Sequence, residues 1–143
     1  MMTAQTSFKS KFLAALLALV AGVFGGHRFY LYGSRDRWAW LHGPLFIVGL
    51  LGVWRFVSQH MDDGLTWALL GVFVAVVIAV VVQTLVIGLT PDERWDARWN
   101  QGIDRRSANG WGPVLIVIFA LFMSVGSLTG GLAYVLQRFF GGA

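Results

Sequence analysis

The sequence GVFGGHRFYLYG, residues 22–33, stands at the end of the first apolar segment of this 143-residue chain. An apolar run from Phe12 to Phe24 leads directly into a glycine pair, then into His27 and Arg28, and then into aromatic residues. Ionisable side chains are costly inside a bilayer unless a neighbouring group or the head-group layer solvates them. The stretch therefore indicates a tight turn at a membrane boundary, in which the glycine pair lets the backbone turn.

The composition places the whole chain in a membrane. It is 57% hydrophobic and 13% charged, whereas about a quarter of the residues of a soluble domain are charged. The absence of cysteine excludes disulfides and thiolate metal sites. The net charge of +4 comes from scattered residues rather than from a basic patch with interleaved aromatics, so we expect no nucleic-acid partner.

The apolar stretches predict four transmembrane helices. A helix needs about 20 residues to cross the hydrocarbon core, and the stretches of suitable length are residues 12–32, 38–57, 65–89 and 114–136. A lone strand would leave its backbone groups unpaired in lipid, so these segments must be helical. The fold class predicted is therefore an all-α integral membrane protein with four spans and both termini on one side.

The turn resembles the signature of the TM2-domain family, which is Gly-x-x-Gly-small-(His or Asp)-Arg-Phe-Tyr between two membrane helices. The residues that fill this signature are Gly22, Gly25, Gly26, His27, Arg28, Phe29 and Tyr30. The family usually has glycine directly after Phe-Tyr-Leu, whereas this chain has Tyr32 and then Gly33. The resemblance covers about residues 9–57 and implies a helical hairpin without implying an activity.

We expect three parts along the chain: a short tail (1–8), a TM2-like hairpin (9–60) and a C-terminal helix pair (61–143). A secretory signal peptide is the alternative reading of the first apolar run. Its cleavage near Gly22 would split the turn motif, so we expect a membrane helix there.

The orientation is predicted from the basic residues in the loops. One side would hold seven: Arg28, Arg35, Arg37, Arg94, Arg98, Arg105 and Arg106. The other side would hold four: Lys9, Lys11, Arg55 and Arg138. This count predicts that the first and third loops are cytoplasmic and that both termini are outside, although the two lysines ahead of the first helix argue for the reverse.

The polar residues near the turn have a structural and a functional interpretation. Structurally, Arg28 would pair with Asp36 or with a lipid phosphate; functionally, the turn would be a recognition surface for a partner protein or a head group. His27 and His42 face one membrane side, but two histidines alone are a weak metal or haem signal. No nucleophile, base and orienting acid recur together. The sequence thus predicts no catalytic residue, no cofactor site and no metal site.

Small residues predict where helices pack. The spacing Gly126-x-x-x-Gly130 is a close-approach motif, and Gln83 is expected to hydrogen-bond across helices. We expect this packing to occur within the chain, with a dimer interface as the alternative. The spans lack Asp, Glu and Lys, which argues against an ion-coupled transporter.

An amphipathic helix is predicted over residues 91–107. Thr90 would cap it, with Glu93 as the capping-box partner. Trp95 and Trp99 form one stripe, Arg94 and Arg98 a second, and three aspartates a third: Asp92, Asp96 and Asp104. An aromatic stripe flanked by charges is typical of an interfacial helix that lies in the head-group layer. Docking to a partner protein through the acidic stripe is the alternative.

Together these features predict a small multi-pass protein of the bacterial inner or plasma membrane. We expect a non-catalytic accessory or assembly component, in contact with the lipid bilayer and with a membrane-protein partner or a second copy. One alternative is an oligomeric small transport or channel protein. A weaker alternative is a membrane redox or metal-binding subunit that uses His27 and His42.

Overall fold

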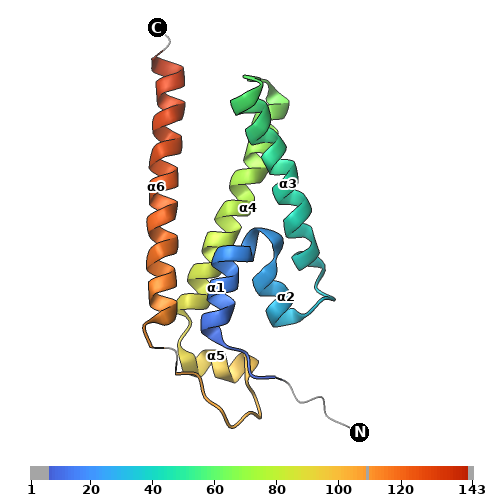
Figure 1. Cartoon of the computed structure of the whole chain (residues 1–143), viewed down its shortest axis with the longest axis vertical. Coiled ribbons are helices and arrows are strands. Elements are labelled where there is room, and N and C mark those ends of the chain that lie inside the picture. The colour runs from blue at the N-terminus through green and yellow to red at the C-terminus, as the bar shows by residue number, and fades with distance from the viewer. Residues whose placement is uncertain (1–6, 109, 142–143) are drawn as a thin grey trace.

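The computed structural model describes residues 7–108 and 110–141, and every regular element in these ranges is helical (Figure 1). Residues 1–6 of the predicted tail lie outside the described residues. The elements are α1 (Lys11–Ala21), η1 (Gly22–Phe24), α2 (Gly26–Tyr32), α3 (Arg37–Ser58), α4 (Gly64–Leu89), α5 (Asp92–Trp99) and α6 (Gly112–Phe140). Three of them, α3, α4 and α6, are long and apolar enough to cross a membrane.

The first predicted span is not a single helix. α1 has 11 residues, which gives a rise of about 16 Å, roughly half of the hydrocarbon core. A 3-10 turn follows, and Gly25 then adopts a left-handed φ of 75° before the seven-residue α2 begins. The prediction of four spanning helices is therefore not confirmed, because residues 12–32 are divided at this glycine.

α1, η1 and α2 form a hairpin that returns to the end at which it began. The ammonium group of Lys9, before α1, donates to the carbonyl oxygen of Tyr30, in α2, at 2.7 Å. The hydroxyl of Tyr30 accepts from the backbone N–H of Ser10 at 2.8 Å. Such a re-entrant hairpin is tolerated at membrane depth only where protein covers it. Here α1 is covered by α4 and α6, and its buried alanines have no exposed surface: Ala14, Ala15 and Ala18.

The two ends of the described chain consequently lie at opposite ends of the molecule. Lys9 lies against α5 and the residue after it: its backbone oxygen accepts from the Trp95 indole at 2.8 Å, and its N–H donates to the Asn100 side chain at 2.8 Å. α6 starts beside α5 and runs to the far end (Figure 1). The described chain thus begins and ends at opposite ends of the molecule, unlike the prediction that both termini share one side, because the hairpin returns to the end at which it began.

α3 and α4 form the closest helix pair. A Cβ on Gly49 would lie 2.7 Å from the Cα of Phe73, and one on Gly52 would lie 2.7 Å from the Cβ of Leu69. At the turn between these helices, Arg55 forms an ion pair with Asp63 at 2.7 Å. Close approach through small residues supplies the van der Waals contact that holds helices together in lipid.

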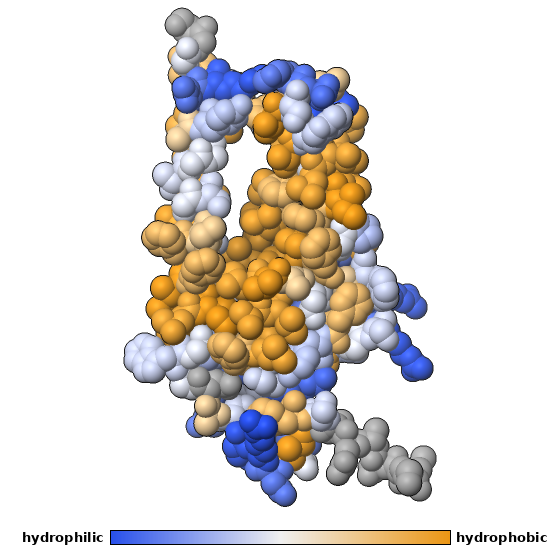
Figure 2. All heavy atoms as spheres, in the orientation of Figure 1, coloured by the Kyte–Doolittle hydropathy of each residue, from blue (hydrophilic) through white to orange (hydrophobic). Residues whose placement is uncertain are grey.

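α6 is buried against the rest of the chain over its first half and touches it again near its C-terminal end, where the Tyr134 ring meets Phe56 at 5.9 Å. Ile116, Val117 and Ala120 are buried in the first half. Further along, a Cβ on Gly126, Gly130 or Gly131 would meet nothing within 4 Å. Figure 2 shows an opening between this part of α6 and the α3–α4 pair.

The predicted amphipathic helix over residues 91–107 is shorter than expected. α5 ends at Trp99. Thr90 does not cap it; the Thr90 hydroxyl donates to the Val86 carbonyl at 2.5 Å, and α5 has no side-chain cap. The chain after α5 is held instead by Asp96, which accepts from the Ser107 hydroxyl at 2.6 Å.

The aromatic and acidic stripes of α5 point into the protein, whereas the sequence predicted that they face the head-group layer or a partner. Trp95 is 3% exposed and belongs to the protein core, so its indole is not available to lipid. Asp96 is buried, and burial opposes its ionisation, but hydrogen bonds from Ser107 and Asn100 lower the pKa of this carboxyl below its ordinary value. Asp92 pairs with Lys11. Two members of the acidic stripe therefore anchor the chain internally.

Candidate functional site at the membrane boundary

The turn motif contributes to a polar cluster between three helices. His27, in α2, is 2% exposed, and its Nε2 hydrogen-bonds the side-chain oxygen of Gln83, in α4. The Gln83 amide nitrogen lies 3.4 Å from Nε2 of His42, in α3. Gln83 is the strongly polar side chain of an otherwise apolar helix. It thus gives the buried histidine the partner that a membrane environment would not supply.

The bonding pattern specifies tautomers for both histidines. The amide oxygen of Gln83 only accepts, so Nε2 of His27 carries the hydrogen. The Gln83 amide N–H donates to His42 Nε2, which leaves the hydrogen of His42 on Nδ1, where it donates to the Trp38 carbonyl at 2.6 Å. Nδ1 of His27 is buried and has no partner within the described residues.

The two histidine rings are not joined by further potential metal ligands in the part of the chain that the structure describes. Their centroids lie 6.1 Å apart in an edge-to-face arrangement. No group of three or more His, Cys, Asp or Glu side chains gathers among residues 7–108 and 110–141.

Arg28 links the hairpin to the start of α3. Its Nε donates to the Asp36 carboxylate at 2.7 Å, and its guanidinium group lies 4.9 Å from the centre of the Tyr32 ring. Asp36 also caps α3 by accepting from the Trp38 N–H at 3.1 Å. The hydrogen bond from Arg28 lowers the pKa of the Asp36 carboxyl below its ordinary value. Of the two structural partners expected for Arg28, the structure shows Asp36.

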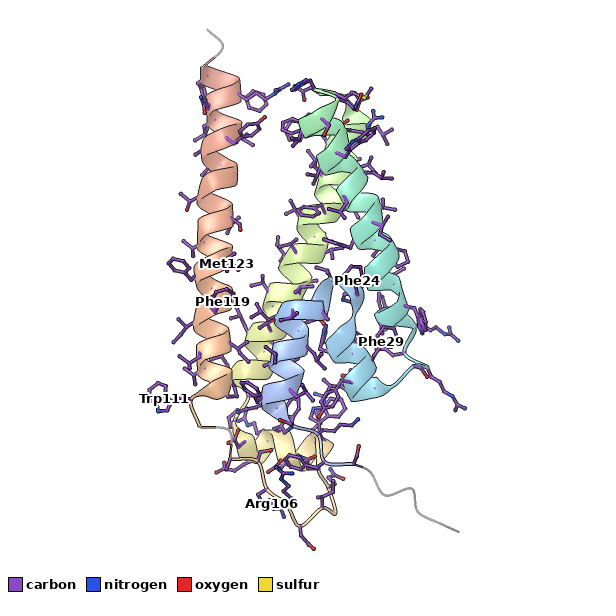
Figure 3. The ribbon with its side chains drawn as sticks, in the orientation of Figure 1. Phe24, Phe29, Arg106, Trp111, Phe119 and Met123 are labelled. Carbon is purple, nitrogen blue, oxygen red and sulfur yellow. The ribbon has the colours of Figure 1, made fainter. Side chains whose placement is uncertain are left out.

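The aromatic residues of the motif make contacts within the protein. Phe29 packs edge-to-face on Trp40 at 5.2 Å, and Phe24 packs on Phe46 at 5.7 Å. Figure 3 shows Phe24 and Phe29 on the side of the hairpin that faces α3. The motif residues therefore fasten a re-entrant hairpin to the first spanning helix.

The match to known proteins covers this same unit. Residues 7–59 match the family model described as the TM2 domain. These residues form a TM2 domain. The family recognised in the sequence is thereby confirmed, and in this chain the domain comprises α1, η1, α2 and α3. Neither the curated proteins nor the solved structures include a match to the chain.

A cavity of about 210 Å³ lies where the TM2 domain meets α4 and α5. His27 and Gln83 line it beside apolar residues of α4, and three arginines line it as well: Arg28, Arg94 and Arg98. Arg94 and Arg98 are exposed, and Trp99 packs on Tyr32 of the TM2 domain at 5.1 Å. The predicted interfacial residues of α5 thus share one cavity with two of the predicted turn residues, His27 and Arg28.

Basic residues gather at the end of the molecule that holds this cavity. Of the 11 Lys and Arg residues, nine lie at this end: Lys9, Lys11, Arg28, Arg35, Arg37, Arg94, Arg98, Arg105 and Arg106. Arg55 and Arg138 lie at the other end, each near an aspartate. Because the TM2 hairpin re-enters, the two N-terminal lysines join the larger group and no longer oppose it.

Sequence reasoning missed the residues that attach α5. Asn100 is fully buried and bonds Lys9 through both its side-chain oxygen and its nitrogen. Lys11 is buried and donates to the Thr90 carbonyl at 2.9 Å. A loop asparagine carries no periodic signal, and the sequence analysis counted Lys11 only as a basic residue beside the first helix, so neither contact was predicted.

We expect the substitution Arg28→Ala to destabilise the protein more than Arg35→Ala. Arg28 is partly buried and bonded to the α3 cap, whereas Arg35 is exposed. Hydrogen bonds to charged groups contribute about 1.5–3 kcal/mol to the free energy of unfolding. Substitutions of exposed residues usually change it by less than about 0.5 kcal/mol. The thermal midpoint in a mild detergent measures the difference. Equal midpoints for the two variants would contradict a special role for Arg28.

Proposed function

We propose that this protein is a non-catalytic accessory or assembly component of the bacterial inner membrane, and that it binds a helix of another membrane protein through α6. The three spanning-capable helices and the TM2 domain support a small multi-pass membrane protein. The observation that carries the proposal is the middle of α6, around Gly126, Gly130 and Gly131, where a Cβ would meet nothing within 4 Å and an opening separates α6 from the α3–α4 pair.

The uncovered face of α6 is the continuation of its packed face. With 3.6 residues per turn, the side that presents Val117 and Ala120 to the chain next presents three small residues: Ser124, Ser127 and Gly131. Farther on, the same side carries Tyr134, whose ring meets Phe56 of α3 at 5.9 Å. The small residues thus border the opening seen in Figure 2.

A partner helix suits this face better than lipid does. Small residues let two backbones approach closely, and serine hydroxyls can hydrogen-bond across helices. Acyl chains gain little from such a surface because it offers few atoms for van der Waals contact. The opening is bounded at its far end by Arg138 and Asp62, 3.7 Å apart, which fixes α6 at a distance from α3.

Site-specific photo-cross-linking in intact membranes tests the proposal. A photoreactive residue at Ser127 or Gly131 is expected to cross-link to a transmembrane peptide of a different protein, identified by mass spectrometry. The matched controls are Gly126 and Thr129, which lie on the opposite side of α6, and these should give little product. Equal cross-linking from both sides would contradict a specific face.

The alternative function, an oligomeric transport or channel protein, predicts another product in the same experiment. The cross-linked peptide would then come from a second copy of this chain. That result would assign the opening beside α6 to a homo-oligomer and would overturn the accessory role.

A further inference from the structure

Two hollows meet on either side of Arg94. One, of about 370 Å³, is lined by Leu85, Leu89 and Pro91 among others. The other is the cavity of about 210 Å³ that reaches His27. Val86, Thr90 and Arg94 line both, so the two form one groove along the end of α4 with an arginine between its halves.

The charges around this groove favour an anion. Arg94 and Arg98 are one helical turn apart on α5 and exposed, and neither forms an ion pair within the described residues. Arg28, the third arginine of the groove, is already paired with Asp36. Nearby Asp96 is turned inward and bonded to Ser107. Both arginines line the smaller hollow, and the donor fork of a guanidinium group matches the geometry of a phosphate.

The apolar residues in the walls of the groove favour a phosphate ester with hydrocarbon chains over a free phosphate. The larger hollow is mostly apolar, with Leu85 and Leu89 from α4 beside Thr90 and Arg94. The smaller one adds Leu31 and Ile87. Trp99 of α5, which is partly exposed, also lines the smaller hollow. A free phosphate would leave this apolar surface unused.

We propose that this groove binds one anionic phospholipid, with its phosphate on Arg94 and Arg98 and an acyl chain in each hollow. Basic pockets between membrane helices on the cytoplasmic side are a recurring way of holding anionic head groups. The groove does not include the α6 face, so lipid binding in the groove can be tested independently of the proposed partner protein.

Native mass spectrometry of the full chain tests the site. The protein is released from micelles that contain equal amounts of phosphatidylglycerol and phosphatidylcholine with identical acyl chains. We expect about fivefold or greater preference for the anionic lipid. In the double variant Arg94→Gln/Arg98→Gln this preference should vanish. The matched control, Arg35→Gln/Arg37→Gln, removes the same charge at the same end and should keep it.

Two further arms separate a lipid from a free phosphate. Val86 lines both hollows and is exposed, so Val86→Trp should fill them and reduce lipid retention several-fold without a change in helix content. Inorganic phosphate at about 50 mM, a concentration chosen far above that of the lipid, should leave the bound lipid in place because it cannot replace the acyl-chain contacts. Equal retention of both lipids, or displacement by phosphate, would overturn the proposal.

Discussion

Cysteines placed at Ser7 and Ser34 are expected to resist an impermeant thiol reagent in intact cells, whereas one placed at His60 should label fully. Ser7 and Ser34 lie at the end that holds nine of the 11 Lys and Arg residues, and His60 lies at the other end. The positive-inside rule puts the basic end in the cytoplasm. The native chain has no cysteine, so each variant reports a single position.

This labelling experiment also distinguishes a re-entrant hairpin from a first span. A crossing helix over residues 12–32 would place Ser7 and Ser34 on opposite sides of the membrane. The hairpin places them on one side, as the bond between Lys9 and Tyr30 requires. Labelling after permeabilisation controls for accessibility. Different reactivity at Ser7 and Ser34 would contradict the hairpin, and the reverse pattern at all three positions would contradict only the orientation.

Replacement of Gly25 by alanine is expected to be the most damaging single change in the TM2 domain. Gly25 has a φ of 75°, and a Cβ there would lie 2.5 Å from the backbone oxygen of Ala39. The left-handed conformation alone costs a residue with a side chain about 1–2 kcal/mol. The contact with backbone cannot be relieved by a rotamer change, so the hairpin must move away from α3.

Gly102→Ala is the matched control for this prediction. Gly102 has a φ of 74°, but a Cβ there would meet nothing within 4 Å. It should therefore show the conformational cost alone, about 1–2 kcal/mol. We expect Gly25→Ala to lower the thermal midpoint in detergent at least about twice as far, since overpacking adds roughly 1–3 kcal/mol. Equal shifts would indicate that the close approach to Ala39 contributes nothing.

The long spanning helices could be read from the sequence with small errors at their ends. The predicted stretches 38–57, 65–89 and 114–136 correspond to α3, α4 and α6. This was possible because lipid offers the backbone no hydrogen-bond partner. A long apolar segment must therefore pair its own N–H and C=O groups, which it does as a helix. The turn motif likewise identified the TM2 domain, because its residues are adjacent in the chain.

The first apolar segment and the connection after α4 could not be read in this way. Apolar residues look the same in a sequence whether lipid or protein covers them. α1 ends at Ala21 and the chain then turns at Gly25, which fits against Ala39. His27 can be buried there because Gln83, 56 positions later, reaches it. α5 ends where Asp96 receives bonds from Asn100 and Ser107.

The sequence by itself therefore determined that this is a helical membrane protein with a TM2 turn, and it located the three helices that are long enough to span a membrane while predicting a fourth that the structure does not confirm. Only the tertiary structure decided that the first segment turns back on itself, that nine basic residues gather at one end, and that Arg94 lies between two hollows. The physical reason is the range of the interactions. Helix formation in lipid depends on a residue's immediate neighbours, whereas the depth of a short helix and the lining of a cavity depend on contacts between distant segments.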